Sequence, residues 1–422
     1  MMCAPAEPRP LAQHASHHPA TLGPVSLYVH VPFCVLKCAY CDFHSQPFCD
    51  VSPEEPEHFA WAVGEAARHW AALGVLDDVL SLYVGGGTPT TLGDGLTGSI
   101  ADLCAIANMR PGAEITVETN PDTSSPELAA RLHASGVTRF SVGVQSFDGA
   151  DLRVLGRCHD AQAAERAVRE LVATGARVAL DLMCGVPGQS LASWQATLER
   201  AVATGAGHVS VYPLTVEEAT PLAHHVATGA LPEPDPDAAA EMMERADEVL
   251  ADAGLARYEI ASYAREGEQC VHNLGYWTGR PYIGLGPSAS SMVPVAAFRA
   301  AAASESWADP SVVGVGRVIV DVPADAARVR FTHAADTVAF IRTATGAPEE
   351  VEYLTAEEAL REDVVLGLRL AEGVAADLAE RAGVVDALLR LEQQALVERA
   401  GGRWRLTRRG WLLGNEVFAE VW

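Results

Sequence analysis

Residues 27–43 read LYVHVPFCVLKCAYCDF. The first five form a short apolar run rich in β-branched residues, which is typical of a buried strand. Cys34, Cys38 and Cys41 follow within eight residues of one loop, close enough to bind a single metal centre without a long-range loop closure. The stretch therefore predicts a strand that leads directly into a metal-binding loop.

The same alternation of strand and helix repeats along the first half of the chain. Short apolar runs are followed by helical stretches, three of which end at glycine, a residue favoured just past a helix C-terminus. We expect strands at 27–31, 82–84, 114–118, 139–144, 178–183 and 209–212, and helices at 56–73, 96–107, 126–134, 161–173 and 194–203. This spacing indicates right-handed βαβ units and a parallel sheet. Six units favour an α/β fold built on a partial, TIM-like (β/α)6 barrel over a flat doubly wound sheet.

Chemically distinctive residues follow the carboxyl ends of these strands. The cysteines follow the first strand, and Gly85-Gly86-Gly87-Thr88-Pro89 follows the second. Glu118 closes the third strand, Gln145 the fourth, and Asp181 lies near the end of the fifth. Because the carboxyl ends of parallel strands meet at one rim, we expect these residues to converge there.

Composition narrows the class of protein. The chain has 422 residues, 49% of them apolar, which is enough for one large domain and smaller ones. A formal net charge of −25 argues against nucleic-acid binding, which needs a basic surface. The sequence contains no run of roughly 18 to 20 apolar residues, the length that a membrane span requires. The N-terminal segment does not resemble a signal peptide. Nine scattered cysteines fit a reducing compartment, so we expect a cytoplasmic protein.

Changes in pattern predict four segments. Residues 1–24 form a disordered N-terminal extension, residues 25–220 the barrel, and residues 221–350 a covering region that contains a glycine- and aromatic-rich stretch. Residues 351–422 form a winged-helix-like domain, in which Thr355 and Glu358 have the spacing of a capping box. The acidity of the chain favours a lid or packing role for this last domain over DNA reading.

Three cysteine ligands leave one coordination position open. A structural zinc site is the main alternative, and it would require a fourth ligand such as His30, His44 or Cys49. Zinc sites are usually built from paired cysteine motifs, and the sequence has no second pair. An iron–sulfur cluster is therefore favoured.

The cysteine segment resembles the radical S-adenosylmethionine (SAM) signature of the oxygen-independent coproporphyrinogen III oxidase-like superfamily. Residues 28–43 carry the signature, and residues 85–90, 141–147, 155–157 and 181–189 extend the resemblance over nearly the whole chain from about residue 25. The resemblance implies that Cys34, Cys38 and Cys41 ligate three irons of a [4Fe-4S] cluster and that SAM chelates the fourth. It also implies a cofactor pocket lined by Tyr28, Tyr40, Gly86, Gly87, Thr88, Glu118, Gln145, Arg157 and Asp181. In that pocket Glu118 can accept from the cofactor ammonium and Arg157 can pair with a carboxylate.

Two positions point to one branch of this superfamily. Coproporphyrinogen dehydrogenases carry a fourth cysteine where this chain has Phe43, and residues 272–277 match the His-Asn-x-x-Tyr-Trp motif of the haem chaperone family HemW. An imidazole can ligate haem iron, so the resemblance implies that His272 takes part in haem binding, with Cys270 as an alternative ligand. A packed core histidine and a plain buried thiol stay open as structural alternatives. Ser290 stands where family members often have a histidine.

The resemblance thus implies a haem chaperone that binds haem and a SAM-coordinated [4Fe-4S] cluster and transfers haem to an acceptor protein. The alternative is a radical SAM enzyme that acts on a porphyrin or porphyrinogen, such as an oxygen-independent coproporphyrinogen III dehydrogenase, which Phe43 disfavours. The motifs assign no catalytic residue. The implied partners are a haem-acceptor protein and an electron donor, without nucleic acid or a membrane span. Transient contact with a membrane protein stays open, as does the choice between monomer and homodimer.

Overall fold

Six parallel strands form the centre of the computed structural model, which describes residues 22–303, 322–344 and 348–422. They are β1 (Val25–Val31), β4 (Val79–Gly86), β5 (Met109–Thr119), β6 (Arg139–Gln145), β7 (Arg177–Cys184) and β8 (His208–Pro213). They lie side by side in chain order, so the chain always advances in the same direction around the sheet. A doubly wound sheet would reverse that direction. The partial (β/α)6 barrel predicted from the sequence is confirmed.

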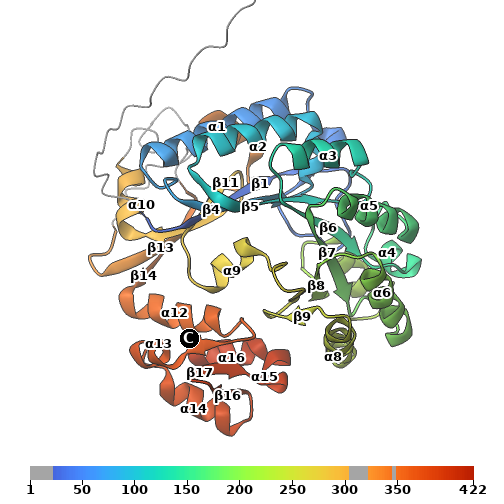
Figure 1. The fold of residues 1–422 in the computed structure, drawn as a ribbon, viewed down its shortest axis with the longest axis vertical. Coiled ribbons are helices and arrows are strands. Elements are labelled where there is room, and N and C mark those ends of the chain that lie inside the picture. Colours follow the sequence, from blue (N-terminus) through green and yellow to red (C-terminus); the bar gives the residue numbers. More distant parts are fainter. Residues whose placement is uncertain (1–21, 304–321, 345–347) are drawn as a thin grey trace, which may run out of the picture.

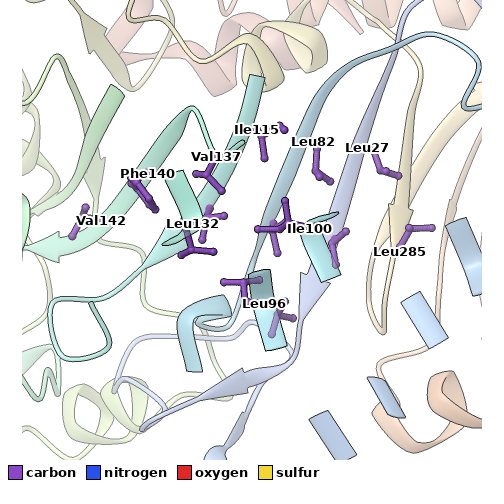
Figure 2. Packing of buried hydrophobic residues seen from close by; sticks show 14 of the residues in the cluster. Leu27, Leu82, Leu96, Ile100, Ile115, Leu132, Val137, Phe140, Val142 and Leu285 are labelled. Atoms are coloured by element: carbon purple, nitrogen blue, oxygen red, sulfur yellow. The ribbon is translucent and has the colours of Figure 1, made fainter. Parts of the chain in front are cut away.

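Helices cover the outer face of this sheet (Figure 1). They are α1 (Glu55–Ala72), α2 (Asp94–Ile106), α3 (Pro126–Ala134), α4 (Gly149–Val154), α5 (Ala161–Ala173) and α6 (Leu191–Ala203). Helix α3 begins as its sequence predicts, because the Ser125 side chain accepts from the Leu128 N–H and Pro126 takes the first helical position. Figure 2 shows Leu27, Leu82 and Phe140 of the strands in one core with the α2 and α3 side chains Leu96 and Leu132.

Short elements shape the loops at the carboxyl ends of the strands. They are β2 (Phe33–Cys34), β3 (Gln46–Pro47), and the 3-10 helices η1 (Phe48–Asp50) and η2 (Pro89–Leu92). The β2–β3 pair closes the cysteine loop at its base, with Phe33 opposite Gln46. The first cysteine is therefore held by sheet pairing and not by an open loop.

Further strands widen the sheet at both edges. Strands β11 (Tyr282–Leu285), β12 (Ser290–Pro294), β13 (Ala326–Thr332) and β14 (Glu350–Thr355) continue it beyond β1, and β10 (Ser262–Ala264) and β9 (Ala256–Arg257) continue it beyond β8. The helices of this region are α7 (Pro221–Ala227), α8 (Pro236–Asp252), α9 (Val271–Trp277), α10 (Val295–Ala302) and α11 (Thr337–Thr343). Helix α9 lies between the sheet and the C-terminal helices (Figure 1).

The C-terminal part has a hydrophobic core of its own. Its elements are α12 (Ala356–Gly367), β15 (Val374–Ala375), α13 (Ala376–Arg381), α14 (Val385–Gln393), β16 (Val397–Ala400), β17 (Arg403–Leu406), α15 (Arg408–Leu412) and α16 (Gly414–Val421). The predicted capping box is confirmed, because the Thr355 and Glu358 side chains each accept from the other residue's backbone N–H. Strand β14 belongs to the main sheet, and the buried residues of the separate core run from Val364 to Val421.

The Arg369 guanidinium lies 5.0 Å from the Trp277 ring and 4.6 Å from the Phe418 ring, which joins α9 to the C-terminal part.

Among the described residues, no helix is long and apolar enough to cross a membrane. The predicted N-terminal extension, residues 1–24, lies almost entirely outside the described residues, and the segment boundaries at 24, 220 and 350 stay predictions.

Candidate functional site

A cavity of about 380 Å³ lies at the carboxyl ends of the six parallel strands. Side chains from the ends of all six strands or from the loops that follow them line it, as the strand pattern predicted. The lining consists of Cys34, Leu36, Lys37, Cys38, Tyr40, Cys41, Phe43, Ser45, Tyr83, Gly86, Gly87, Thr88, Glu118, Thr119, Asn120, Ser141, Gly143, Gln145, Arg157, Asp181, Met183 and Tyr212. Residues far apart in the sequence thus share one pocket.

The three cysteines face this pocket. Burial raises the pKa of the Cys34 thiol, and it raises the pKa of Cys41 to about 11. Such thiols stay protonated at neutral pH until a metal cation compensates the thiolate charge. Arg157 Nη1 donates to Cys38 Sγ over 3.0 Å, and Thr88 Oγ1 lies 3.7 Å from Cys34 Sγ. Both contacts bring a hydrogen-bond donor to a cysteine sulfur.

The residues that a zinc site could add to the three cysteines are bonded elsewhere or exposed. Among the described residues, no three His, Cys, Asp or Glu side chains gather closely enough to hold one metal ion. The fourth ligands that a zinc site would need are committed elsewhere: His30 Nε2 bonds the His44 carbonyl, and His44 Nε2 bonds Thr337 Oγ1. Cys49 is exposed on η1.

The glycine loop after β4 packs directly against the cysteine loop. The Gly87 N–H donates to the Val31 carbonyl and the Thr88 N–H to the Phe33 carbonyl, both over 2.7 Å. A Cβ on Gly87 would lie 2.5 Å from the Phe33 oxygen, so only glycine permits this approach. The second loop therefore holds the first in place.

Glu118 is a strongly perturbed acid of the pocket. Burial, reinforced by the nearby Asp181 carboxylate, raises the pKa of Glu118 to about 7. The Tyr83 hydroxyl donates to Glu118 Oε1 over 2.7 Å, and the Gly86 N–H donates to Oε2 over 3.0 Å. A Cβ on Gly85 would lie 2.8 Å from the same carboxyl group. A carboxylate held in this way can bind an ammonium group.

Arg157 and Gln145 also show features of a binding site. Arg157 Nη2 donates to Asn120 Oδ1 and to the Gly143 carbonyl, and its buried Nε–H has no protein acceptor among the described residues. That N–H is free for a ligand. Gln145 has a φ of +66° at a register shift in β6, a backbone conformation that costs energy and is concentrated at functional sites.

Two residues predicted to bind cofactors, Tyr28 and His272, lie outside the pocket lining. Tyr28 sits opposite Tyr83 in the β1–β4 register, and its hydroxyl bonds His30 Nδ1 over 3.1 Å. His272 is 1% exposed, and both of its ring nitrogens are bonded, Nδ1 to Ser81 Oγ and Nε2 to the Tyr276 hydroxyl, each over 3.0 Å.

The backbone around His272 is equally well anchored. The N–H groups of Val271 and His272 donate to the Glu114 carboxylate over 3.0 Å, and Arg177 Nη2 bonds the same carboxylate over 2.9 Å. Burial lowers the pKa of His272 to about 3, so its imidazole is neutral. Cys270 is 0% exposed and buried beside Glu114. Burial and these hydrogen bonds are what the structural alternatives describe for both residues, and the part of His272 or Cys270 in haem binding stays a prediction.

Ser290 also lies away from the pocket. Its hydroxyl bonds Thr332 Oγ1 over 2.8 Å between β12 and β13. Sequence reasoning missed several pocket residues, among them Lys37, Tyr83, Asn120, Ser141 and Met183. Most of these residues lie within or next to the recognised motifs, so closeness in sequence to a motif was the signal that could have found them. Tyr83 and Ser141 face the pocket from within strands, where the alternation of side chains alone did not single them out.

Two family models match this chain, one over most of the barrel and one over the C-terminal part. The family model of the Radical SAM superfamily matches residues 28–201, and that of the HemN C-terminal domain matches residues 354–413. The heme chaperone HemW of Mycobacterium tuberculosis H37Rv is 38% identical over 276 residues, which cover 64% of this chain and 70% of that protein. HemW of Escherichia coli K12 is 37% identical over 276 residues, 64% of this chain and 71% of that protein.

A mouse mitochondrial protein, radical S-adenosyl methionine domain-containing protein 1, is 38% identical over 267 residues, 63% of this chain and 60% of its own length. Among solved structures, coproporphyrinogen III oxidase HemN of Escherichia coli superposes with a TM-score of 0.75 over 96% of this chain and 91% of that one. Its sequence identity of 20% makes this a likeness of fold alone.

The barrel, its cysteine-lined pocket and the C-terminal part together define a protein of the radical SAM superfamily. A radical SAM domain implies SAM and a [4Fe-4S] cluster as cofactors. Within that superfamily, the chain belongs to the HemW family.

Proposed function

We propose that this protein is a haem chaperone: it binds haem, holds a SAM-coordinated [4Fe-4S] cluster, and transfers haem to an acceptor protein. The observation that carries the proposal is Phe43 in the wall of a cysteine-lined pocket. A dehydrogenase of the superfamily would place a fourth cysteine there. Membership of a family whose named relatives are haem chaperones supports the same function.

We assign Cys34, Cys38 and Cys41 as the cluster ligands. When bound, the cluster would supply an electron to the SAM sulfonium. Arg157 would stabilise the ligand sulfur of Cys38 through Nη1, and its free Nε–H would donate to a carboxylate of the cofactor. Glu118 would bind the cofactor ammonium.

The remaining assignments of the pocket follow from its lining. Asp181, which accepts from the Ser141 hydroxyl over 3.2 Å, and Gln145 would hydrogen-bond the ribose hydroxyls of SAM. Tyr40, Gly86, Gly87 and Thr88 would complete the cofactor pocket. Tyr28 would support it from behind the lining. We propose a cytoplasmic location, because nine scattered cysteines fit a reducing compartment. As partners we propose a haem-acceptor protein and an electron donor.

A haem titration tests the function. The full chain, with its cluster reconstituted under anaerobic conditions, is titrated with haem while the Soret band is recorded. In parallel, dithionite, SAM and coproporphyrinogen III are added to a second sample, and 5′-deoxyadenosine and protoporphyrinogen are measured. A shifted, saturable Soret band without porphyrinogen conversion supports the chaperone. Absence of haem binding rejects it, and conversion of the porphyrinogen would establish the dehydrogenase instead.

A further inference from the structure

Three large apolar side chains stand exposed at the mouth of the pocket. Leu36 and Phe43 belong to the cysteine loop and are 53% and 60% exposed, and Tyr212, at the end of β8, is 40% exposed. Strands β1 and β8 are the two ends of the six-strand run, so these side chains bracket the opening from both ends of the run. Exposed apolar groups gathered around a cavity mark a ligand surface more often than a free one.

The charge at this mouth comes from an unusual residue for this chain. Lysine and arginine together number 30, and Lys37 is the only lysine. A chain that uses arginine at every other basic position keeps lysine at the one that lies between two cluster cysteines. Lysine differs from arginine in being a compact point charge on a flexible stem. The cysteine loop therefore carries one flexible ammonium between Cys34 and Cys38.

Lys37 is also the exposed cation of the pocket and has donors to spare, whereas the free Nε–H of Arg157 is buried. Its Nζ donates to the Phe43 carbonyl over 3.1 Å, which occupies one of three N–H groups. The other cation of the lining, Arg157, has both terminal nitrogens committed to Cys38, Asn120 and Gly143. An anionic group arriving from solvent therefore meets Lys37 first, because Lys37 is exposed.

We propose that haem docks across the mouth of the pocket, with its macrocycle on Leu36, Phe43 and Tyr212 and a propionate paired with Lys37. The inference rests on the proposed haem-chaperone function and gives that function a place. A flat apolar plate with carboxylates on one edge complements an apolar rim that carries a single exposed ammonium. The site is distinct from the stretch around His272, which is buried. Haem in this position covers SAM, so bound haem slows the release of SAM.

The test uses the full chain with its cluster reconstituted and SAM bound, and iron and sulfide analysis establishes that each variant is loaded. Haem affinity is measured by anaerobic titration of the Soret band. Phe43→Ser and Leu36→Ser are each expected to weaken haem binding about five- to tenfold through lost apolar contact. Lys37→Gln is expected to weaken it up to about fivefold, whereas Lys37→Arg stays closer to the parent protein.

Leu389→Ser is the matched control, because Leu389 is 42% exposed on α14 in the C-terminal part and undergoes the same chemical change. It should leave haem affinity unchanged. Release of labelled SAM, followed with and without haem, gives a second readout, and haem should slow it in the parent protein more than in Phe43→Ser.

The outcomes separate the site from the function. If the parent protein does not bind haem, the proposed function fails. If it binds haem, and both Phe43→Ser and Leu36→Ser bind haem within twofold of it, the docking site is wrong while the function stands. If the variants slow cluster reduction by a flavin-containing donor protein but keep haem affinity, the rim serves the donor and the proposal is overturned.

Discussion

Replacing Glu118 by glutamine removes one charge from the pocket and leaves its shape nearly unchanged. The glutamine oxygen can still accept from the Gly86 N–H, and its amide can face the Tyr83 hydroxyl in place of Oε1. Only the ionic partner of the SAM ammonium is lost. Hydrogen bonds to charged groups contribute about 2 to 3 kcal/mol, which corresponds to a loss of SAM affinity of about 30- to 150-fold.

The pH dependence of SAM binding gives an independent measure of the same interaction. The pKa of Glu118 is raised to about 7, so the carboxyl is largely protonated at pH 6 and largely ionised at pH 7.5. The ammonium binds the ionised form, so affinity should increase with pH, by about eightfold between these two values. Glu118→Gln should show no such rise.

The assay is an anaerobic titration of the cluster-reconstituted protein with SAM, followed by the change in the EPR spectrum of the reduced cluster. Glu392→Gln serves as the control, because Glu392 is exposed on α14 and its replacement removes the same charge far from the pocket. It should reproduce the affinity and the pH slope of the parent protein. The reasoning would be refuted if Glu118→Gln bound SAM as tightly as the parent protein with the same pH slope.

Three further predictions concern the fold that supports the site. His272 and His333 are buried with their pKa lowered to about 3 and about 4, below the unfolded value of 6.5, so their contribution to stability is present above pH 6.5 and is lost as the pH falls. Between pH 7.5 and 5.5 the two should cost about 3 kcal/mol in urea unfolding of Glu118→Gln, a variant that lacks the opposing proton uptake of Glu118, and a rise in the stability of this variant on acidification would contradict this. Gly87→Ala should displace the cysteine loop and more than halve the bound iron, whereas Gly98→Ala, with nothing within 4 Å of its new Cβ, should keep it. Equal iron in both variants would reject the steric argument. Thr355→Ala should lower the free energy of unfolding of the C-terminal part by about 1 kcal/mol through loss of the capping box, as measured by thermal unfolding against the exposed control Thr228→Ala. Identical unfolding midpoints would show that the cap is not needed.

Local sequence patterns are enough to predict the order of strands and helices and the rim at which the chemistry gathers. The β-branched runs, the glycines past helix ends and the Ser125-Pro126 start of α3 act through backbone conformation and hydrogen bonds between near neighbours. Parallel strands always bring their carboxyl ends together. The amino-acid sequence alone therefore places Cys34, Glu118 and Asp181 in one pocket.

Whether a motif residue can be reached by a ligand depends instead on the packing of distant segments. His272 stands in a motif that predicts haem contact, yet Ser81 of β4 and Glu114 of β5 bury it and satisfy its hydrogen bonds. Those partners lie far from it in the sequence, and no periodicity near residue 272 reveals them. The pKa of Glu118 likewise depends on burial by strands distant in sequence. Burial and charge environment are properties of the packed whole, so the three-dimensional fold alone assigns His272 to the core and Lys37 to the mouth of the pocket.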